Sequence, residues 1–278
     1  MSNYPPYLGH KQQFKVNRLT EIGAYIDGGD TEILVPVKYL PQGIRPDDML
    51  DVFIYHDNEG RLIGTTLSPL IEVGEVAALN CVSVTNHGAF MEWGIQRDLF
   101  VPFAEQSDEI VEGRKYLVYA YIDEVSGKVV GSTKLSKHLG NLPPQYNPGD
   151  KVSGVVYGRN DFGYRVVVDN KHWGMIYYSE DAVNYHHGDR VELYVVRLRE
   201  DGRIDLSIKP VGLKRITNSA DKLLDLLKKK KRLPIGDKSD PQEIRKQTGL
   251  SKKAFKMAAG ILYKERLIKI GPDSIELV

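Results

Sequence analysis

Five short β-rich runs follow one another in residues 152–209, and Gly, Asn and Asp separate them. Runs of this length with turn residues between them are typical of a small closed barrel. Aromatic and Arg side chains are concentrated in the same segment. Because aromatic rings stack on bases and Arg neutralises phosphates, single-stranded nucleic acid is the first ligand to consider for such a barrel.

The same order of features occurs three times along the chain, which indicates a tandem repeat. Each unit has a glycine where the chain turns into a strand, and these glycines, Gly23, Gly88 and Gly163, are 65 and 75 residues apart. A glycine has no Cβ, so it lets the chain turn tightly at this point. Residues 68–74 and 138–149, which contain Pro and Gly, fit as linkers. The repeat therefore predicts three barrels in tandem.

The hydrophobic period changes from two to 3.6 in residues 213–278, which predicts helices. A first helix is expected over residues 219–231. Asp240 is the expected N-cap of a second helix, where Glu243 would complete a capping box, and Ser251 is the expected N-cap of a third. A short hairpin closes the chain. This order of helices, turn and hairpin resembles a winged-helix domain.

The third unit resembles the S1 RNA-binding domain, which is an OB-fold module. The resemblance is carried by an aromatic before a glycine, a G-M-I-Y-Y-S strand, a G-D-R-V turn and a closing G-R-I-D-L-S-I-K, at residues 162–163, 174–179, 188–191 and 202–209. Three such units followed by the C-terminal segment resemble the conserved virulence factor B family of bacterial RNA-binding regulators. This resemblance covers nearly the whole chain.

The resemblance implies a mainly β fold with a C-terminal α+β domain. Three tandem five-stranded S1-like OB barrels would be followed by a winged-helix domain. The expected boundaries are residues 1–70, 71–140 and 145–212 for the barrels and residues 215–278 for the winged helix. The family also implies a role in the post-transcriptional regulation of gene expression.

The RNA-binding positions of the S1 family, carried over one by one, point to one face of the third barrel. Arg165 stands where the family often has a second aromatic, Tyr177 where it has His, and Arg199 where it has Asp. A guanidinium can stack on a base and contact a phosphate, so Arg is compatible with RNA binding here. Strand alternation places Trp173 on the same face as Tyr177. The residues of this barrel that we expect to contact RNA are Phe162, Tyr164, Arg165, Trp173, Tyr177, Arg197 and Arg199.

Composition favours the third barrel over the other two as the RNA binder. Residues 141–212 hold 7 of the 16 tyrosines, although the alternative is that several of these rings fill the barrel. Residues 1–75 hold 6 basic and 11 acidic residues, with Ile22 at the first aromatic position, and a negative face repels phosphate. The second unit keeps His87 and Phe90, which we expect to act as auxiliary RNA contacts. A spacer or a protein-contact barrel is the alternative for both units.

Positive charge is concentrated at the C-terminal end of the chain. Residues 213–278 contain 17 Lys and Arg against 8 Asp and Glu, whereas residues 1–212 contain 21 against 29. This asymmetry indicates that a polyanion meets the C-terminal part, the alternative being a solvated basic helix face. The third helix is the usual nucleic-acid reader of a winged helix, and here it would present Lys252, Lys253 and Lys256. Lysines attract phosphates without reading sequence, so base-specific DNA recognition is not expected; protein docking is the other alternative.

We therefore expect a non-enzymatic protein that binds single-stranded RNA and needs no metal or other cofactor. The ribosome and RNA-processing proteins are open as further partners. The main alternative is a transcription regulator that reads duplex DNA through its winged helix. Catalysis is not expected, because the sequence has no P-loop, no H-E-x-x-H and no carboxylate cluster at metal-binding spacing.

Cysteine use and hydropathy bear on the location of the protein. The single cysteine, Cys81, cannot form an internal disulfide and stands in an apolar run, so we expect it in the core. The N-terminus lacks the apolar stretch of a secretory signal, and no segment approaches the ~20 apolar residues of a membrane span. We therefore expect a cytoplasmic protein that does not meet a membrane.

Overall fold

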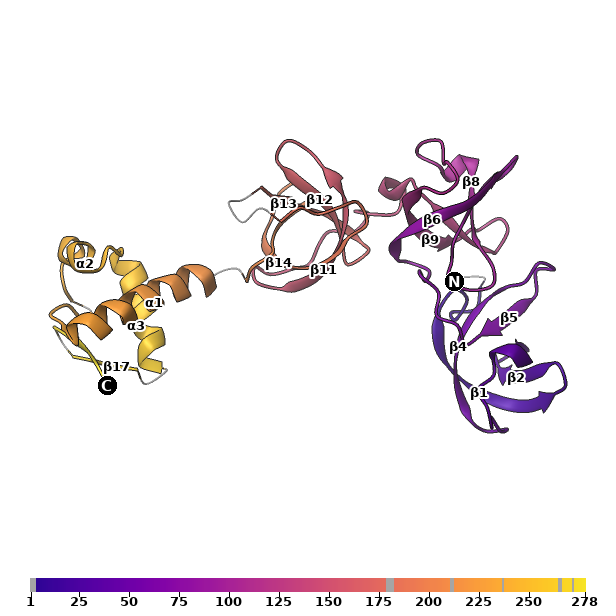
Figure 1. Cartoon of the computed structure of the whole chain (residues 1–278), viewed down its shortest axis with the longest axis horizontal. Helices are drawn as coiled ribbons and strands as arrows, with labels where there is room; N and C mark the ends of the chain where they lie inside the picture. The colour runs from indigo at the N-terminus through magenta and orange to yellow at the C-terminus, as the bar shows by residue number, and fades with distance from the viewer. Residues whose placement is uncertain (1–3, 179–182, 211–212, 237, 265–266, 272) are drawn as a thin grey trace. The chain divides into compact units, whose positions relative to one another are not determined.

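Three sets of five strands and a C-terminal helical region make up the fold of this computed structural model (Figure 1). The structure describes the chain except for residues 1–3, 179–182, 211–212, 237, 265–266 and 272. The expected fold class is confirmed, because three five-stranded barrels precede a winged-helix region and most of the regular elements are strands. The barrels lie mostly in one compact unit and the helical region in another. None of the described helices is long and apolar enough to cross a membrane.

The first barrel has the strands β1 (Lys11–Thr20), β2 (Gly23–Asp27), β3 (Glu32–Pro36), β4 (Met49–His56) and β5 (Leu62–Thr65), and the 3-10 helix η1 (Val37–Tyr39). Apolar residues alternate along these strands, so that Val16, Val35 and Val52 are fully buried inside the ring. The strands close in the order β1-β2-β3-β5-β4, with β3 and β5 parallel.

The second unit has the strands β6 (Val76–Thr85), β7 (Gly88–Met91), β8 (Leu99–Pro102), β9 (Lys115–Ile122) and β10 (Val129–Ser132), and the 3-10 helices η2 (Phe103–Glu105) and η3 (Leu135–Lys137). Its strand order, β10-β9-β6-β7-β8, corresponds strand for strand to the order β5-β4-β1-β2-β3 of the first barrel. Within the described chain no hydrogen-bonded ladder joins β8 and β10, although the two strands lie side by side, as the parallel pair of the first barrel does.

The third barrel has the strands β11 (Lys151–Arg159), β12 (Gly163–Val168), β13 (His172–Tyr177), β14 (Arg190–Leu198) and β15 (Ile204–Ser207). It closes in the order β11-β12-β13-β15-β14. β13 and β15 run parallel, with Gly174 opposite Ile204. This closing pair brings the β13 strand, which carries Trp173 and Tyr177, next to the last strand of the barrel.

The repeat is visible in backbone detail as well as in strand order. In each unit the ladder between the first two strands contains a β-bulge, which in the third unit falls between Val156 and Gly158. A bulge bends a strand and so helps a sheet to curve into a barrel. A Cβ on Gly23, Gly88 or Gly163 would lie 2.1, 2.3 or 2.0 Å from a backbone oxygen of the facing strand. The predicted reason for these three glycines, a close backbone approach, is therefore confirmed.

Trp93 belongs to a core that the first and second barrels share. Its indole N–H donates to the backbone oxygen of Ile71 over 2.8 Å, and its ring meets those of Phe53 and Tyr55 edge to face at 5.4 and 6.2 Å. Such aromatic pairs contribute ~0.5–1.5 kcal/mol beyond the area they bury. Cys81 lies in the same core with 2% of its surface exposed, as predicted, and burial raises the pKa of its thiol.

The C-terminal region has the elements α1 (Leu213–Lys230), β16 (Arg232–Leu233), α2 (Pro241–Thr248), α3 (Lys252–Lys264), β17 (Ile268–Ile270) and β18 (Ile275–Leu277). The three strands form one small sheet in the order β16-β18-β17. Apolar side chains from the helices and the sheet share a single core, which includes Leu223, Leu227, Ile244, Phe255, Leu262 and Ile275. The expected winged-helix order of elements is therefore present.

The ends of these helices agree only in part with the prediction. α1 begins at Leu213, ahead of the expected residue 219. Asp240 occupies the N-cap of α2, but no side-chain capping bond forms there, so the expected capping box with Glu243 is wrong. Ser251 does cap α3, because its hydroxyl accepts a 3.3 Å hydrogen bond from the N–H of Ala254. The strand β16 was not predicted, since two residues are too few to show a period.

Three histidines of the barrels are held neutral by burial. Burial lowers the pKa of His56, His138 and His172 below the ordinary value of 6.5, and one ring nitrogen of each is buried without a hydrogen-bond partner among the described residues. As the pH falls through 6.5, the unfolded chain binds protons that the folded chain does not, so folding loses stability.

We expect the melting temperature to fall by a few degrees between about pH 7.5 and about pH 5.5, where ordinary carboxylates stay ionised. Thermal unfolding followed by circular dichroism would measure this. His172→Gln should make the fall smaller, because it removes one of the three buried rings whose pKa is lowered. A melting temperature that holds steady over this range would contradict the neutral state of the buried histidines.

Candidate nucleic-acid interface

The outward side of β12, β13 and β15 is the candidate interface. Arg165 of β12 lies opposite Met175 of β13, and Met175 lies opposite Asp205 of β15, so the three side chains share one side of the sheet. Along β13 the odd-numbered residues face outward, with Trp173 and Met175 half-buried and Tyr177 exposed. The predicted common face of Trp173 and Tyr177 is therefore confirmed.

Phe162 and Tyr178 form a pair of exposed rings at the edge of this side. Phe162 is 70% exposed and Tyr178 is 51% exposed, and the N–H of Tyr178 donates to the backbone oxygen of Phe162 over 3.1 Å. Asn160 holds both residues: its side-chain oxygen accepts the N–H of Phe162, and its backbone oxygen accepts the hydroxyl of Tyr178. The loop thus presents two rings on a backbone fixed by hydrogen bonds, which limits the entropy lost when they stack on a ligand.

Tyr178 was missed in the sequence. Alternation places it on the side opposite Tyr177, and its ring packs there against the inward-turned Tyr164 at the end of the strand. The backbone bond to Phe162 then sets its position. The available signal was the pair of adjacent tyrosines at a strand end, next to a turn that already carries an exposed phenylalanine.

Asp205 anchors the polar part of the interface. It is 4% exposed, and it accepts hydrogen bonds from the Tyr177 hydroxyl over 3.1 Å and from Arg197 Nε. Arg199 Nη1 in turn donates to the Tyr177 hydroxyl over 3.0 Å. The bond to Asp205 raises the pKa of the Arg197 guanidinium, which therefore remains charged. One buried carboxylate thus orients a ring and two guanidinium groups at the surface.

Arg165 and Trp173 form a second contact between a cation and rings. The guanidinium carbon of Arg165 lies 4.6 Å from the centre of the Trp173 ring and 5.0 Å from that of Tyr157. Trp173 also meets Tyr157 edge to face at 5.3 Å. A groove of about 690 Å³ lies beside Arg165, Trp173 and Arg203, and residues 139–144 form part of its wall. Its size and its cations suit a strand of nucleotides.

Tyr164 does not reach the surface that carries these residues. It is 7% exposed, and its ring packs edge to face against Tyr178 at 5.4 Å and Tyr185 at 5.3 Å. The neighbouring Arg165 points outward, so alternation along β12 turns Tyr164 inward. Its ring therefore supports Tyr178 from behind. We call the surface formed by these side chains the third-barrel face. It comprises the exposed Phe162, Arg165, Tyr177, Tyr178, Arg197 and Arg199 and the half-buried Trp173, which also packs against a core that includes Leu135 and Leu139.

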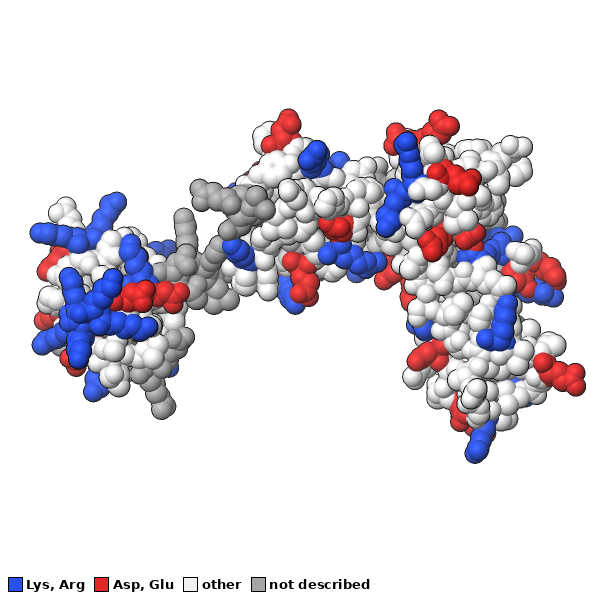
Figure 2. Space-filling model, viewed as in Figure 1, with Lys and Arg blue, Asp and Glu red and all other residues white. Residues whose placement is uncertain are grey.

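The winged-helix region has a surface rich in Lys and Arg (Figure 2). Lys253 and Lys256 of α3 are exposed, as expected. Lys252 is half-buried instead, because its ammonium donates to the backbone oxygen of Ser239 over 2.9 Å. That contact ties the start of α3 to the loop before α2 and leaves Lys252 less free than its neighbours to meet a phosphate. Five consecutive exposed cations follow the core of α1: Lys228, Lys229, Lys230, Lys231 and Arg232.

The first and second barrels differ at the positions that match the third-barrel face. The first presents the aliphatic side chains of Ile22 and Val37, which are 58% and 59% exposed. The second presents His87, which is exposed, and Phe90, which is half-buried. The first barrel also has a cation–ring contact, because the guanidinium carbon of Arg18 lies 3.8 Å from the centre of the half-buried Tyr25 ring. The third barrel differs in the large exposure of its rings at Phe162 and Tyr178. In the described residues, no group of three His, Cys, Asp or Glu side chains comes together as a metal site.

Family models match three parts of the chain. An S1 domain matches residues 8–67, an S1 RNA binding domain matches residues 145–209, and a CvfB-like winged helix domain matches residues 221–277. YitL of Bacillus subtilis is 26% identical over 275 residues, which are 92% of this chain and 89% of YitL. Conserved virulence factor B of Staphylococcus epidermidis is 25% identical over 234 residues, which are 81% of this chain and 78% of that protein.

A solved structure also resembles the whole chain. It is a multidomain protein with nucleic acid binding domains from Streptococcus pneumoniae, 20% identical, and the match covers 98% of this chain and 99% of that one with a TM-score of 0.41. The S1 matches coincide with the first and third barrels, and the winged-helix match coincides with the helical region described above. The chain therefore carries S1 domains and a CvfB-like winged-helix domain, and it is similar to YitL and conserved virulence factor B over most of its length.

Proposed function

We propose that this protein binds single-stranded RNA without catalysing a reaction, and that the third-barrel face is its main contact. The match of residues 145–209 to an S1 RNA binding domain implies RNA as a partner of this barrel. The observation that carries the proposal is the exposure of Phe162 at 70% next to the 51% exposed Tyr178. Bases stack on exposed aromatic rings for ~1–3 kcal/mol each, and a backbone hydrogen bond between Tyr178 and Phe162 holds these two residues next to each other.

The guanidinium groups give the face its attraction for the RNA backbone. Arg197 and Arg199 are held outward through Asp205 and Tyr177, and Arg165 lies over Trp173. Neutralised phosphates release counterions, so the affinity should fall as salt rises. The exposed lysines Lys253 and Lys256 would add contacts of the same sequence-independent kind, and His87 and Phe90 would act as auxiliary contacts.

The biological role that fits this chemistry is post-transcriptional regulation of gene expression in the cytoplasm, in which the protein acts on RNA. Stacking and phosphate contacts do not select one sequence strongly. We therefore expect the protein to act on many transcripts, with the ribosome or RNA-processing proteins as further partners. S1 and CvfB-like domains favour nucleic-acid binding over catalysis.

A competition between two unlabelled nucleic acids for a labelled single-stranded RNA tests the proposal. Single-stranded RNA should displace the label at a concentration about tenfold or more below that of duplex DNA, because duplex bases are paired and cannot stack on exposed rings. The two competitors should have equal numbers of phosphates, so that charge alone does not decide the result. Stronger displacement by duplex DNA would favour a DNA-binding regulator that uses the winged helix.

A further inference from the structure

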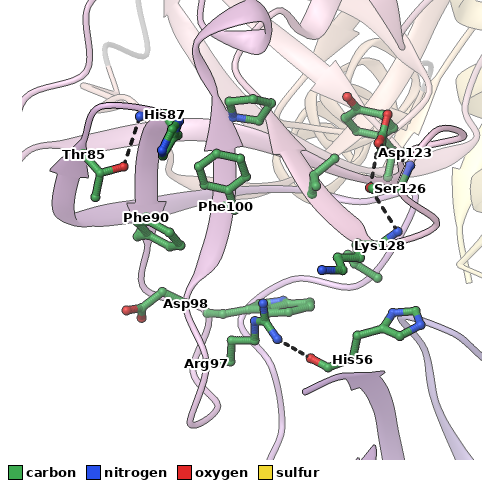
Figure 3. Close-up of a pocket in the computed structure, with 15 residues that line it drawn as sticks. His56, Thr85, His87, Phe90, Arg97, Asp98, Phe100, Asp123, Ser126 and Lys128 are labelled. Atoms are coloured by element: carbon green, nitrogen blue, oxygen red, sulfur yellow. Dashed lines mark hydrogen bonds between the residues drawn. The ribbon is translucent and has the colours of Figure 1, made fainter. Parts of the chain in front are cut away.

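The second barrel has a pocket of about 490 Å³ beside β7, β8 and β10 (Figure 3). Residues of β8 and of β10 line it together, and these are the two strands that no ladder joins in the described chain. The closed first and third barrels have a parallel pair at this point. The volume falls within the ~300–1,000 Å³ typical of small-molecule sites. We call this cavity the second-barrel pocket.

Aromatic rings form one wall of the pocket. Phe90 of β7 lies directly opposite Phe100 of β8, and their ring centres are 5.1 Å apart with a tilt of 43°. Both rings are half-buried, so each keeps an open side. Pro102 and Tyr121 continue the lining, and burial raises the pKa of Tyr121 to about 12, which keeps its hydroxyl a neutral donor. A flat ring entering the pocket would therefore meet aromatic surface.

Charged and polar groups stand at the opposite side of the pocket. Figure 3 shows Lys128 and Ser126 across from Phe90 and Phe100, with Arg97 and His56 nearby. Arg97 donates to the backbone oxygen of His56 over 2.7 Å. Within the described residues, neither Arg97 nor Lys128 forms an ion pair with a carboxylate. Their positive charge is therefore available to a ligand.

The pocket also contains polar groups that could meet the edge of a base. His56 Nδ1 is buried without a hydrogen-bond partner among the described residues. Asp98 lines the pocket, and burial, followed by the nearby Glu92, raises the pKa of its carboxyl group. Asp123 is occupied, because its carboxylate accepts the hydroxyl of Ser126 over 2.7 Å. A ligand with donors and acceptors around a flat ring would meet the Asp98 carboxyl group in the lining.

We propose that the second-barrel pocket binds one nucleotide, with its base against Phe90 and Phe100 and its phosphate near Arg97 and Lys128. An apolar ligand would leave both cations without a partner, whereas a ring that carries a phosphate uses the rings and the cations together. The nucleotide is either free or part of an RNA chain. The inference rests on the proposed function for the RNA source, because that proposal already includes Phe90 and His87 of this barrel as auxiliary RNA contacts. It goes further in adding Phe100, Arg97 and Lys128 and in allowing a free nucleotide as the ligand.

The two tryptophans of the chain make the pocket measurable. Trp93 lines it, and Trp173 belongs to the third-barrel face, so Trp173→Phe leaves Trp93 as the only tryptophan. Titration of this variant with adenosine or uridine monophosphate should change the Trp93 emission in a saturable way. Phe90→Ala on the same background should weaken this binding about tenfold or more. Phe103→Ala is the matched control, because Phe103 is 52% exposed on the same barrel but does not line the pocket.

Lys128→Gln covers the case in which Phe90→Ala does not fold. It should weaken binding of adenosine monophosphate and leave binding of adenosine, which has no phosphate, unchanged. In the natural protein, crosslinking with a short RNA that contains 4-thiouridine distinguishes the source: crosslinks to peptides of β7 and β8 without any response to mononucleotides would assign the pocket to RNA. Absence of both a saturable mononucleotide response and crosslinks would overturn the proposal. The double variant Phe162→Ala/Tyr178→Ala tests the third-barrel face separately. If this variant loses RNA binding but still responds to mononucleotides, the second-barrel pocket is upheld.

Discussion

Replacing Phe162 and Tyr178 together by Ala is expected to weaken the binding of single-stranded RNA by about 30-fold or more. Each ring that stacks on a base contributes ~1–3 kcal/mol, so the loss of two rings costs at least ~2 kcal/mol. Both side chains are largely exposed, at 70% and 51%, so their removal should leave the barrel folded. Fluorescence anisotropy of a labelled single-stranded RNA would measure the affinity, and circular dichroism would check the fold.

The salt dependence of the same variant identifies which interaction is lost. Stacking involves no counterion release, so the slope of log affinity against log salt should stay as it is in the natural protein. Ile22→Ala is the matched control, because Ile22 is 58% exposed at the corresponding position of the first barrel. Unchanged RNA affinity in the double variant would show that the third-barrel face is not the binding surface. An equal loss in Ile22→Ala would indicate a non-specific effect.

The parts of the fold that follow local rules could be predicted from the sequence. The glycines Gly23, Gly88 and Gly163 indicated three equal units because the backbone at that point excludes a Cβ in each unit. The order of helices and hairpin in the C-terminal region followed from period and caps. Gly249 ends α2 in the left-handed conformation with φ at 69°, which glycine adopts without strain. Such signals depend on a few neighbouring residues, so they can be recognised without knowledge of the tertiary contacts.

The arrangement of the candidate site depends on contacts between distant residues, and there the sequence was less informative. Asp205 reads as a surface residue in the run R-I-D-L-S, yet it is 4% exposed because Tyr177 and Arg197 cover it. Tyr164 stands in a motif associated with binding, yet alternation along β12 turns its ring inward. The missing ladder between β8 and β10 has no local signal, since it depends on two strands that are distant in the sequence. Single residues therefore indicated a candidate barrel but not the full set of groups that form its outward face.

Gly163→Ala is expected to destabilise the third barrel by about 3 kcal/mol or more. A Cβ at this position would lie 2.0 Å from the backbone oxygen of Ile176 and 2.8 Å from the Cα of Tyr177. Both atoms belong to the backbone of β13, so a rotamer change cannot relieve the contact, and β12 and β13 must move apart. Their separation would disturb the ladder that places Arg165 opposite Met175.

Gly158→Ala distinguishes this close approach from a general cost of replacing glycine. Gly158 lies in β11 of the same barrel, and a Cβ there would meet no atom within 4 Å. Its replacement should change the stability by less than ~0.5 kcal/mol. Urea unfolding followed by Trp173 fluorescence in a Trp93→Phe background reports on the third barrel for both variants. Because Tyr177 and Tyr178 follow directly from the displaced strand, Gly163→Ala should also lose RNA affinity under conditions where the protein is still folded. If the two alanine variants were equally stable, the tight packing of β12 against β13, which positions the rings of the third-barrel face, would be refuted.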